Sequence, residues 1–260
     1  MEAILFFFFA TTLASTSLAY QTDHLLPLSA GGGATRHHHH HHHHHHQISC
    51  SSWHLAVETN NIFGWDIVPG ECEEYVANYM LGHQYHEDCF AVTSTALEYA
   101  KNLTLVGDGK DIWVFDIDET ALSEIDYYSL PDVAFGTKEF NSTKKNEYIK
   151  KGTSPALPAV LELYNNLVPL GFKIVFLSAS TESRASNLKR AGYHTWEKLI
   201  LKQKSEHGTS SLAFKSKKRT ELVEAGYRIL GNMGDQWSDI SSSNPGNRTF
   251  KLPNPMYYVA

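Results

Sequence analysis

Two carboxylates, Asp116 and Asp118, directly follow the apolar run of residues 112–115. Alternate side chains of an extended chain project to the same side, so both carboxylates would face one point beyond the carboxyl end of a buried strand. Carboxylates held this close repel each other, and a hard divalent cation or a shared proton relieves the repulsion. The pair therefore indicates a reaction centre, although an acidic turn that caps a helix with Thr120 is the competing interpretation.

Further polar residues accompany later apolar runs. Ser178 follows residues 172–177, Asp235 and Asp239 follow residues 227–230, and Lys215 lies shortly before that second run. Parallel strands bring their carboxyl ends to one edge of a sheet, so we expect these side chains beside the first pair. A nucleophilic carboxylate, a general acid, phosphate donors and a magnesium cage together suit phosphoryl transfer through an aspartyl-phosphate.

The elements that must position these residues alternate between strand and helix over residues 111–260. Predicted strands cover residues 112–115, 172–177, 199–201, 227–230 and 249–252. Predicted helices begin at Ser154-Pro155 and cover about 182–190 and 217–225. This alternation predicts an α/β, Rossmann-like fold with a central parallel sheet flanked by helices. Amphipathic patterns at residues 71–80 and 92–103 predict a helical extension over residues 50–110 before that core.

Residues 123–152 interrupt the alternation directly after the first carboxylates. They show no sustained period and hold several aromatic residues among polar ones, namely Tyr127, Tyr128, Phe135, Phe140 and Tyr148. Reactive sites need walls that exclude water and select the substrate, so we predict a small cap here. An inert surface loop is the alternative.

Short motifs give a family resemblance over residues 50–260. FDIDET at 115–120, FLS at 176–178, FKS at 214–216 and GDQWSD at 234–239 resemble the four motifs of the haloacid dehalogenase (HAD) superfamily. SWHLAVE at 52–58, GYHTWEKLIL at 192–201, GYRILGN at 226–232 and KLPNPMYY at 251–258 resemble the plant acid phosphatases and vegetative storage proteins of that superfamily, of the class III acid phosphatase type.

The resemblance implies a Mg²⁺-dependent acid phosphatase that acts on small phosphomonoesters. Asp116 would attack the phosphorus, and Asp118 would protonate the leaving alcohol and then activate water. Thr120, Ser178 and Lys215 would bind the phosphate, with Lys217 and Lys218 as alternatives to Lys215. The implied Mg²⁺ ligands are Asp116, the backbone carbonyl of Asp118, Asp235 and Asp239. The alternative is a storage protein with weak or no activity; the presence of Asp116 favours the enzyme.

One departure from the family concerns the residues after Ser178. The family shows Gly-Arg there, whereas this chain has Ala179-Ser180, and the segment that follows is about one helical turn shorter. The loss of a guanidinium that contacts charge removes about 1.5–3 kcal/mol. We therefore expect weak activity.

The amino-terminal residues indicate the secretory pathway. Residues 1–19 have the apolar run and small residues of a signal peptide, and residues 20–49 form a flexible linker with ten consecutive histidines at 37–46, a pattern typical of an affinity tag. N-x-S/T triplets at Asn102, Asn141 and Asn247 support a secreted or vacuolar glycoprotein. The net charge of −6 argues against a nucleic-acid partner, and no membrane partner is expected once the signal is removed.

Three cysteines, Cys50, Cys72 and Cys89, allow one disulfide in that compartment. A bridge between Cys50 and Cys72 would contribute about 3 kcal/mol, but the sequence does not select the pair. It does not decide the oligomeric state either, and a homodimer remains open.

Overall fold

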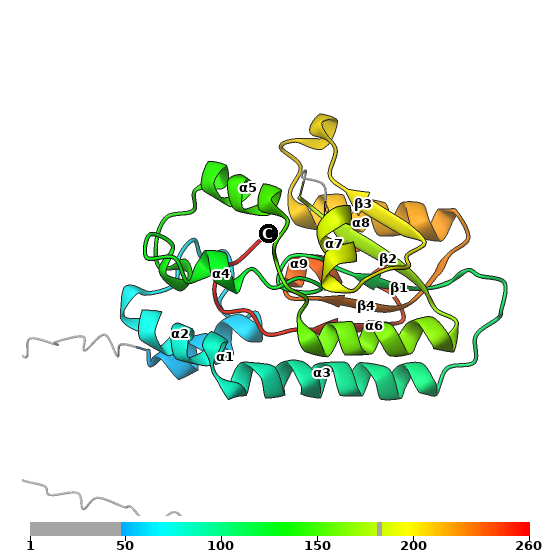
Figure 1. Cartoon of the computed structure of the whole chain (residues 1–260), viewed down its shortest axis with the longest axis horizontal. Helices are drawn as coiled ribbons and strands as arrows, with labels where there is room; N and C mark the ends of the chain where they lie inside the picture. Colours follow the sequence, from blue (N-terminus) through cyan, green and yellow to red (C-terminus); the bar gives the residue numbers. More distant parts are fainter. Residues whose placement is uncertain (1–47, 181–183) are drawn as a thin grey trace, which may run out of the picture. The chain divides into compact units, whose positions relative to one another are not determined.

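A parallel sheet forms the centre of the computed structural model, which describes residues 48–180 and 184–260 (Figure 1). Its strands stand in the order β3-β2-β1-β4-β5, and every neighbouring pair is parallel. They are β1 Asp111–Phe115, β2 Lys173–Ser178, β3 Lys198–Leu201, β4 Arg228–Gly234 and β5 Arg248–Lys251. The predicted α/β fold is confirmed, with β1 in the middle. The predicted signal peptide and residues 20–47 of the linker lie outside the described residues.

Alternate residues of β1 serve two separate cores. Ile112 and Val114 pack with Phe214 of helix α8 (Ser211–Glu224) on one face of the sheet. Trp113 and Phe115 face the larger core, which includes residues of α3 (His83–Lys101) and α6 (Pro158–Leu170). Because both faces are covered, β1 is apolar from Ile112 to Phe115, and the first polar side chain at its carboxyl end is Asp116.

Among the predicted helix starts that are wrong, those of α6 and α8 (Ser211–Glu224) have different reasons. Helix α6 begins at Pro158 rather than at Ser154-Pro155, because the preceding residues are extended: Ala156 bridges to Leu122, and Leu157 N–H donates to the Ala121 carbonyl at 3.1 Å. Helix α8 begins six residues before the predicted position 217, since the Ser210 hydroxyl accepts from Ala213 N–H and caps it. The start of α8 places Lys215 inside a helix.

A helical extension precedes the sheet. It consists of α1 (Cys50–Glu58), a 3-10 turn (Gly70–Cys72), α2 (Glu73–Leu81) and α3, which is much longer than the predicted segment 92–103. A disulfide joins Cys50 to Cys72, with the Cα atoms 5.4 Å apart, and Cys89 is a buried free thiol. The disulfide is one of the pairings that the sequence left open.

The insertion after β1 contains more helix than its sequence indicates. It holds α4 (Ile125–Tyr128), a 3-10 turn (Ala134–Gly136) and α5 (Ser142–Lys151). Helix α5 is mostly polar and buries only Lys145, Tyr148 and Ile149, so it lacks a clear apolar stripe. Helix α7 (Ala185–Ala191) follows β2, and α9 (Trp237–Ile240) follows β4.

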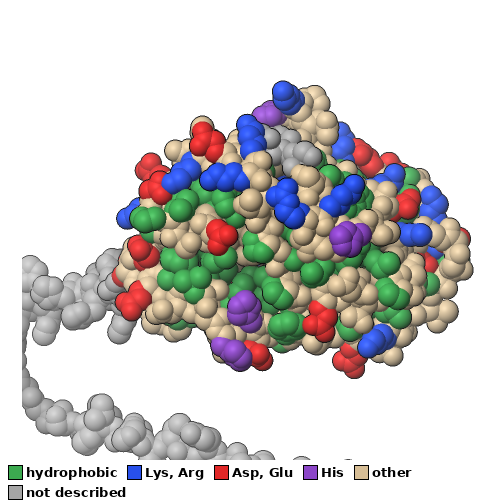
Figure 2. Space-filling model, in the orientation of Figure 1, with side chains coloured by type: hydrophobic (Ala, Val, Ile, Leu, Met, Phe, Trp, Pro, Cys, Tyr) green, Lys and Arg blue, Asp and Glu red, His purple; other side chains and the backbone are tan. Residues whose placement is uncertain are grey.

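Charged side chains of both signs lie among apolar ones on the face shown in Figure 2. Among the described residues, no helix has the length and apolar character needed to cross a bilayer. Several carboxylates line a cavity at the carboxyl ends of the strands.

Candidate active site

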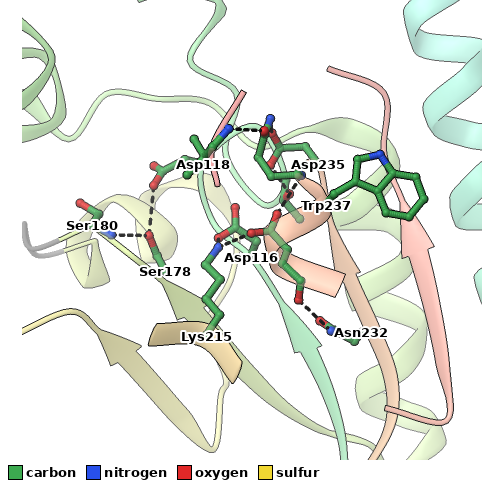
Figure 3. Close-up of polar contacts among 12 residues, drawn as sticks. Asp116, Asp118, Ser178, Ser180, Lys215, Asn232, Asp235 and Trp237 are labelled. Atoms are coloured by element: carbon green, nitrogen blue, oxygen red, sulfur yellow. Dashed lines mark hydrogen bonds and ion pairs between the residues drawn. The ribbon is translucent and has the colours of Figure 1, made fainter. Parts of the chain in front are cut away.

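The structure brings the predicted polar residues together at one edge of the sheet (Figure 3). They line a cavity of about 510 Å³ and come from different elements. Asp116 and Asp118 follow β1, Ser178 ends β2, Lys215 lies on α8, and Asp235 and Asp239 follow β4. The cavity therefore lies where parallel α/β sheets place their ligands.

A tight turn connects the first carboxylates to the rest of the chain. Leu122 N–H donates to the Ile117 carbonyl at 2.8 Å, and Glu119 at the turn has a left-handed backbone with φ of 55°. That conformation is unfavourable for a residue with a Cβ, but the buried Glu119 carboxylate accepts from Glu124 N–H and so supports the turn. Burial and the nearby Glu124 carboxylate raise the pKa of Glu119.

Lys215 pairs with two carboxylates of the cavity. Its Nζ donates to Asp116 Oδ1 and, at 2.5 Å, to Asp239 Oδ1. Burial alone would lower the pKa of Lys215, but Asp116 and Asp239 outweigh it and raise that pKa. Lys217 and Lys218, the alternatives, pair with glutamates outside the cavity instead.

Three buried carboxylates offer a site for a cation. One oxygen each from Asp116, Asp235 and Asp239 lies within 4.8 Å of the others. Burial, followed by the neighbouring carboxylates, raises the pKa of Asp116 despite Lys215, and burial with Asp239 raises the pKa of Asp235 to about 6. The single ammonium group of Lys215 cannot neutralise three carboxylates, so negative charge remains uncompensated. Carboxylate oxygens are also the ligands that a hard divalent cation prefers.

The predicted ligand Asp118 stands apart from this group. Its side chain is not part of the carboxylate cluster, and its backbone carbonyl lies 3.5 Å from the Tyr257 hydroxyl. A metal contact through that carbonyl stays a prediction.

Asp235 is held by three protein donors. Thr120 Oγ1 donates to Oδ1 at 3.0 Å, while Gln236 Nε2 and Asn254 Nδ2 donate to Oδ2 at 2.8 and 2.7 Å. Thr120 is fully buried and does not line the cavity. Its observed contact is with Asp235, and its predicted phosphate contact stays a prediction.

Asp118 has a different set of partners from Asp116. Ser178 Oγ donates to Asp118 Oδ2 at 3.1 Å, and Arg184 Nη2 donates to Asp118 Oδ1. Burial raises the pKa of Asp118, but Arg184 and Lys145 outweigh it and lower that pKa overall. The two carboxylates of the DxD motif thus have pKa values shifted in opposite directions.

Three charged residues beside Asp118 were not predicted as site residues from the sequence, namely Arg184, Glu124 and Lys145. Arg184 is completely buried and also donates to Glu124 Oε1 at 2.8 Å, and Lys145 on α5 donates to Glu124 Oε2. A guanidinium is therefore present near Asp118 although Ala179-Ser180 lacks the usual one. Arg184 does not line the cavity, so a missing phosphate contact and weak activity stay predictions. An arginine four residues after Ser180 was the available signal.

The insertion contributes directly to the cavity wall. Lys145 Nζ lies 4.6 and 4.5 Å from the ring centres of Tyr127 and Tyr128, and Tyr128 stacks on Tyr257 at 5.2 Å. Cavity residues from outside the core motifs include Trp65, Glu124, Tyr128, Phe140, Lys145, Tyr257 and Tyr258. Part of the insertion therefore lines the cavity, and its role as a cap stays a prediction.

Comparisons with known proteins agree on one family. The model of HAD superfamily subfamily IIIB (acid phosphatase) matches residues 34–260. "Acid phosphatase 1" of Solanum lycopersicum is 44% identical over 217 residues, which is 82% of this chain and 84% of the relative. "Stem 28 kDa glycoprotein" of Glycine max is 47% identical, covering 82% and 85%, and "Vegetative storage protein 1" of Arabidopsis thaliana is 42% identical, covering 81% and 79%.

A solved structure supports the fold. The class C acid phosphatase from Bacillus anthracis aligns with a TM-score of 0.57 at 21% identity, over 72% of this chain and 85% of that one.

Proposed function

Because this chain belongs to the HAD superfamily, subfamily IIIB of the acid phosphatases, we propose that it hydrolyses phosphomonoesters with Mg²⁺ through a phosphorylated Asp116. The observation that carries the proposal is the buried group of Asp116, Asp235 and Asp239 around Lys215, at the edge of a cavity open to a small substrate.

Asp116 would be the nucleophile. Its carboxylate oxygen would form a bond to phosphorus as the bond from phosphorus to the ester oxygen breaks. The Lys215 ammonium, which is hydrogen-bonded to Asp116, would offset the repulsion between that carboxylate and the phosphoryl oxygens. Water would then attack phosphorus, release inorganic phosphate and restore the carboxylate.

The carboxylates of Asp116, Asp235 and Asp239 would hold the cation. When bound, Mg²⁺ supplies positive charge that neutralises the phosphoryl oxygens and orients the phosphate for in-line attack. Thr120, Gln236 and Asn254 would keep Asp235 in place.

Asp118 would protonate the leaving alcohol and later take a proton from the attacking water. Arg184 and Lys145 lower the pKa of Asp118, which opposes this role in the free protein. A phosphate that enters the cavity brings negative charge beside Asp118 and favours its protonated form. The substrate would thus help to prepare its own general acid.

A storage role is the second candidate, supported by the relatives named as stem glycoproteins and vegetative storage proteins. The same relatives are consistent with a secretory-type protein, and we propose that this chain is secreted or vacuolar. Storage alone does not require a buried nucleophile paired with a lysine.

Hydrolysis of p-nitrophenyl phosphate at about pH 5 to 6 tests the proposal. We expect turnover that EDTA abolishes and that Asp116→Asn lowers about a thousandfold or more. Asp126 is an exposed aspartate of α4, so Asp126→Asn is the matched control and should retain activity. Absence of metal-dependent turnover in the wild-type protein between about pH 4 and 8 would contradict the catalytic proposal and favour storage.

A further inference from the structure

A segment near the carboxyl end of the chain, residues 252–258, passes directly beside the carboxylate cluster. It follows β5 and appears in red in Figure 1, and its Tyr257 stacks on Tyr128 of α4. Asn254 is buried within it and donates through Nδ2 to Asp235 Oδ2 at 2.7 Å. Met256 N–H donates to Asn254 Oδ1 at 2.9 Å, so the amide group is held in one orientation.

The backbone of this segment is in turn anchored to Glu58, the last residue of α1. Asn254 N–H donates to Glu58 Oε1 at 2.7 Å, and Lys251 Nζ donates to Glu58 Oε2 at 2.7 Å. Trp237 Nε1, on the short helix beside Asp235, donates to the Glu58 carbonyl at 3.2 Å. Glu58 therefore joins the helical extension to two segments that flank the cation site.

Helix α1, which carries Glu58, is itself held in place by core packing and a disulfide. Its buried residues Trp53 and Val57 belong to the main core, and the disulfide from Cys50 ties its first residue to Cys72. His54, one turn before Glu58, lies with Nε2 3.4 Å from Glu58 Oε1. The Glu58 carboxylate thus has little freedom to move away from Asn254.

We propose that Glu58 and Asn254 are positioning residues for the cation ligand Asp235, with Glu58 acting through the backbone of Asn254. The inference rests on the proposed function, since it assumes that Asp235 binds the cation. Donors behind a metal-binding carboxylate fix its orientation, and their loss typically weakens metal binding by about 10- to 100-fold. The extension outside the sheet would then contribute to metal affinity without touching the metal.

A purely structural role for the same contacts makes a different prediction. In that case, variants would lower the melting temperature of the metal-free protein and leave the stabilisation by added Mg²⁺ unchanged. A positioning role reduces the Mg²⁺-dependent increase itself, because that increase reports the affinity of the folded protein for the ion.

Melting temperatures of the full-length protein, measured in EDTA and then over a Mg²⁺ titration without substrate, separate these roles. We expect Asn254→Ala and Glu58→Ala to weaken apparent Mg²⁺ affinity about 10-fold or more. Glu58→Gln should lie nearer to wild type, because its amide oxygen can still accept from Asn254 N–H. Glu87→Gln, at an exposed pair with His83 on α3, is the matched control and should bind Mg²⁺ like wild type.

Two results would overturn the inference, and they are distinguishable. If wild type binds Mg²⁺ and both alanine variants bind it within about twofold of wild type, the positioning role is wrong while the proposed function stands. If the wild-type protein itself gains no stability from Mg²⁺, both the inference and the Mg²⁺ dependence of the proposed function fail.

Discussion

Replacement of Arg184 by methionine should destabilise the protein far more than loss of an ordinary arginine. Arg184 has no exposed side-chain surface and joins two carboxylates, Asp118 after β1 and Glu124 before α4. Methionine fills a similar volume but removes the charge and every donor. The variant therefore isolates the electrostatic role of the guanidinium.

The structure sets the size of the effect. Removal of one partner from a buried ion pair costs about 3–5 kcal/mol, because the other charge remains buried and uncompensated. Here the remaining charges keep some partners, since Lys145 still pairs with Glu124 and Ser178 still donates to Asp118. We therefore expect the lower end, about 3 kcal/mol, which corresponds to a fall in melting temperature of roughly 6–12 °C for a domain of this size.

Urea unfolding of wild type, Arg184→Met and Arg190→Met measures that cost. Arg190 lies on the same helix, α7, but is exposed, so it controls for loss of a cation from this helix. A double variant, Arg184→Met with Glu124→Gln, should lose less than the sum of the two single variants by about 1–3 kcal/mol, because the uncompensated Glu124 charge is then absent.

The opposite outcome would refute the reasoning. If the free energies of unfolding of Arg184→Met and Arg190→Met differ by less than about 0.5 kcal/mol, the buried Arg184 guanidinium does not stabilise the site. A strictly additive double variant would show that Arg184 and Glu124 do not interact in solution.

Two further predictions concern stability away from the cavity. The double variant Cys50→Ser, Cys72→Ser should have a free energy of unfolding in urea about 3 kcal/mol lower than wild type. An unchanged unfolding midpoint would show that this disulfide does not stabilise the fold. Arg228 hydrogen bonds lower the pKa of Asp111, and they lower that of Asp108 from 3.8 to about 2. Lowered carboxyl pKa values stabilise the fold above the unfolded-state value, and the contribution disappears as the pH falls through the folded-state value. The melting-temperature difference between wild type and Arg228→Met should thus be present at about pH 6 and shrink toward pH 2, and a difference that persists at low pH contradicts this pairing.

Local patterns were enough to predict the sheet and the polar residues that lie at or near its strand ends. An apolar run followed by Asp116 and Asp118 is a short-range signal, because burial of β1 on both faces requires apolar residues until the strand ends. Ser178 and Asp235 follow their strands in the same way. The parallel order then brings these strand ends together without any need to know side-chain contacts.

The predicted boundaries of helices were wrong where contacts with distant residues determine the backbone conformation. Ser154-Pro155 has the local pattern of a helix start, yet the bridge between Ala156 and Leu122 keeps the chain extended until Pro158. Helix α5 was missed because it is mostly polar, although the Asn141 side chain caps its start and Gly152 ends it in a left-handed conformation.

The sequence by itself determined which strand-end residues meet at the carboxyl edge, because strand periodicity and motif spacing are local properties. Only the tertiary structure decided how the two aspartates differ: Asp116 pairs with Lys215, Asp118 with Arg184, and their pKa values shift in opposite directions. It also decided that Glu58 and Asn254, which are 196 positions apart, meet behind Asp235. Such contacts depend on packing between segments far apart in the chain, and no short-range pattern encodes them.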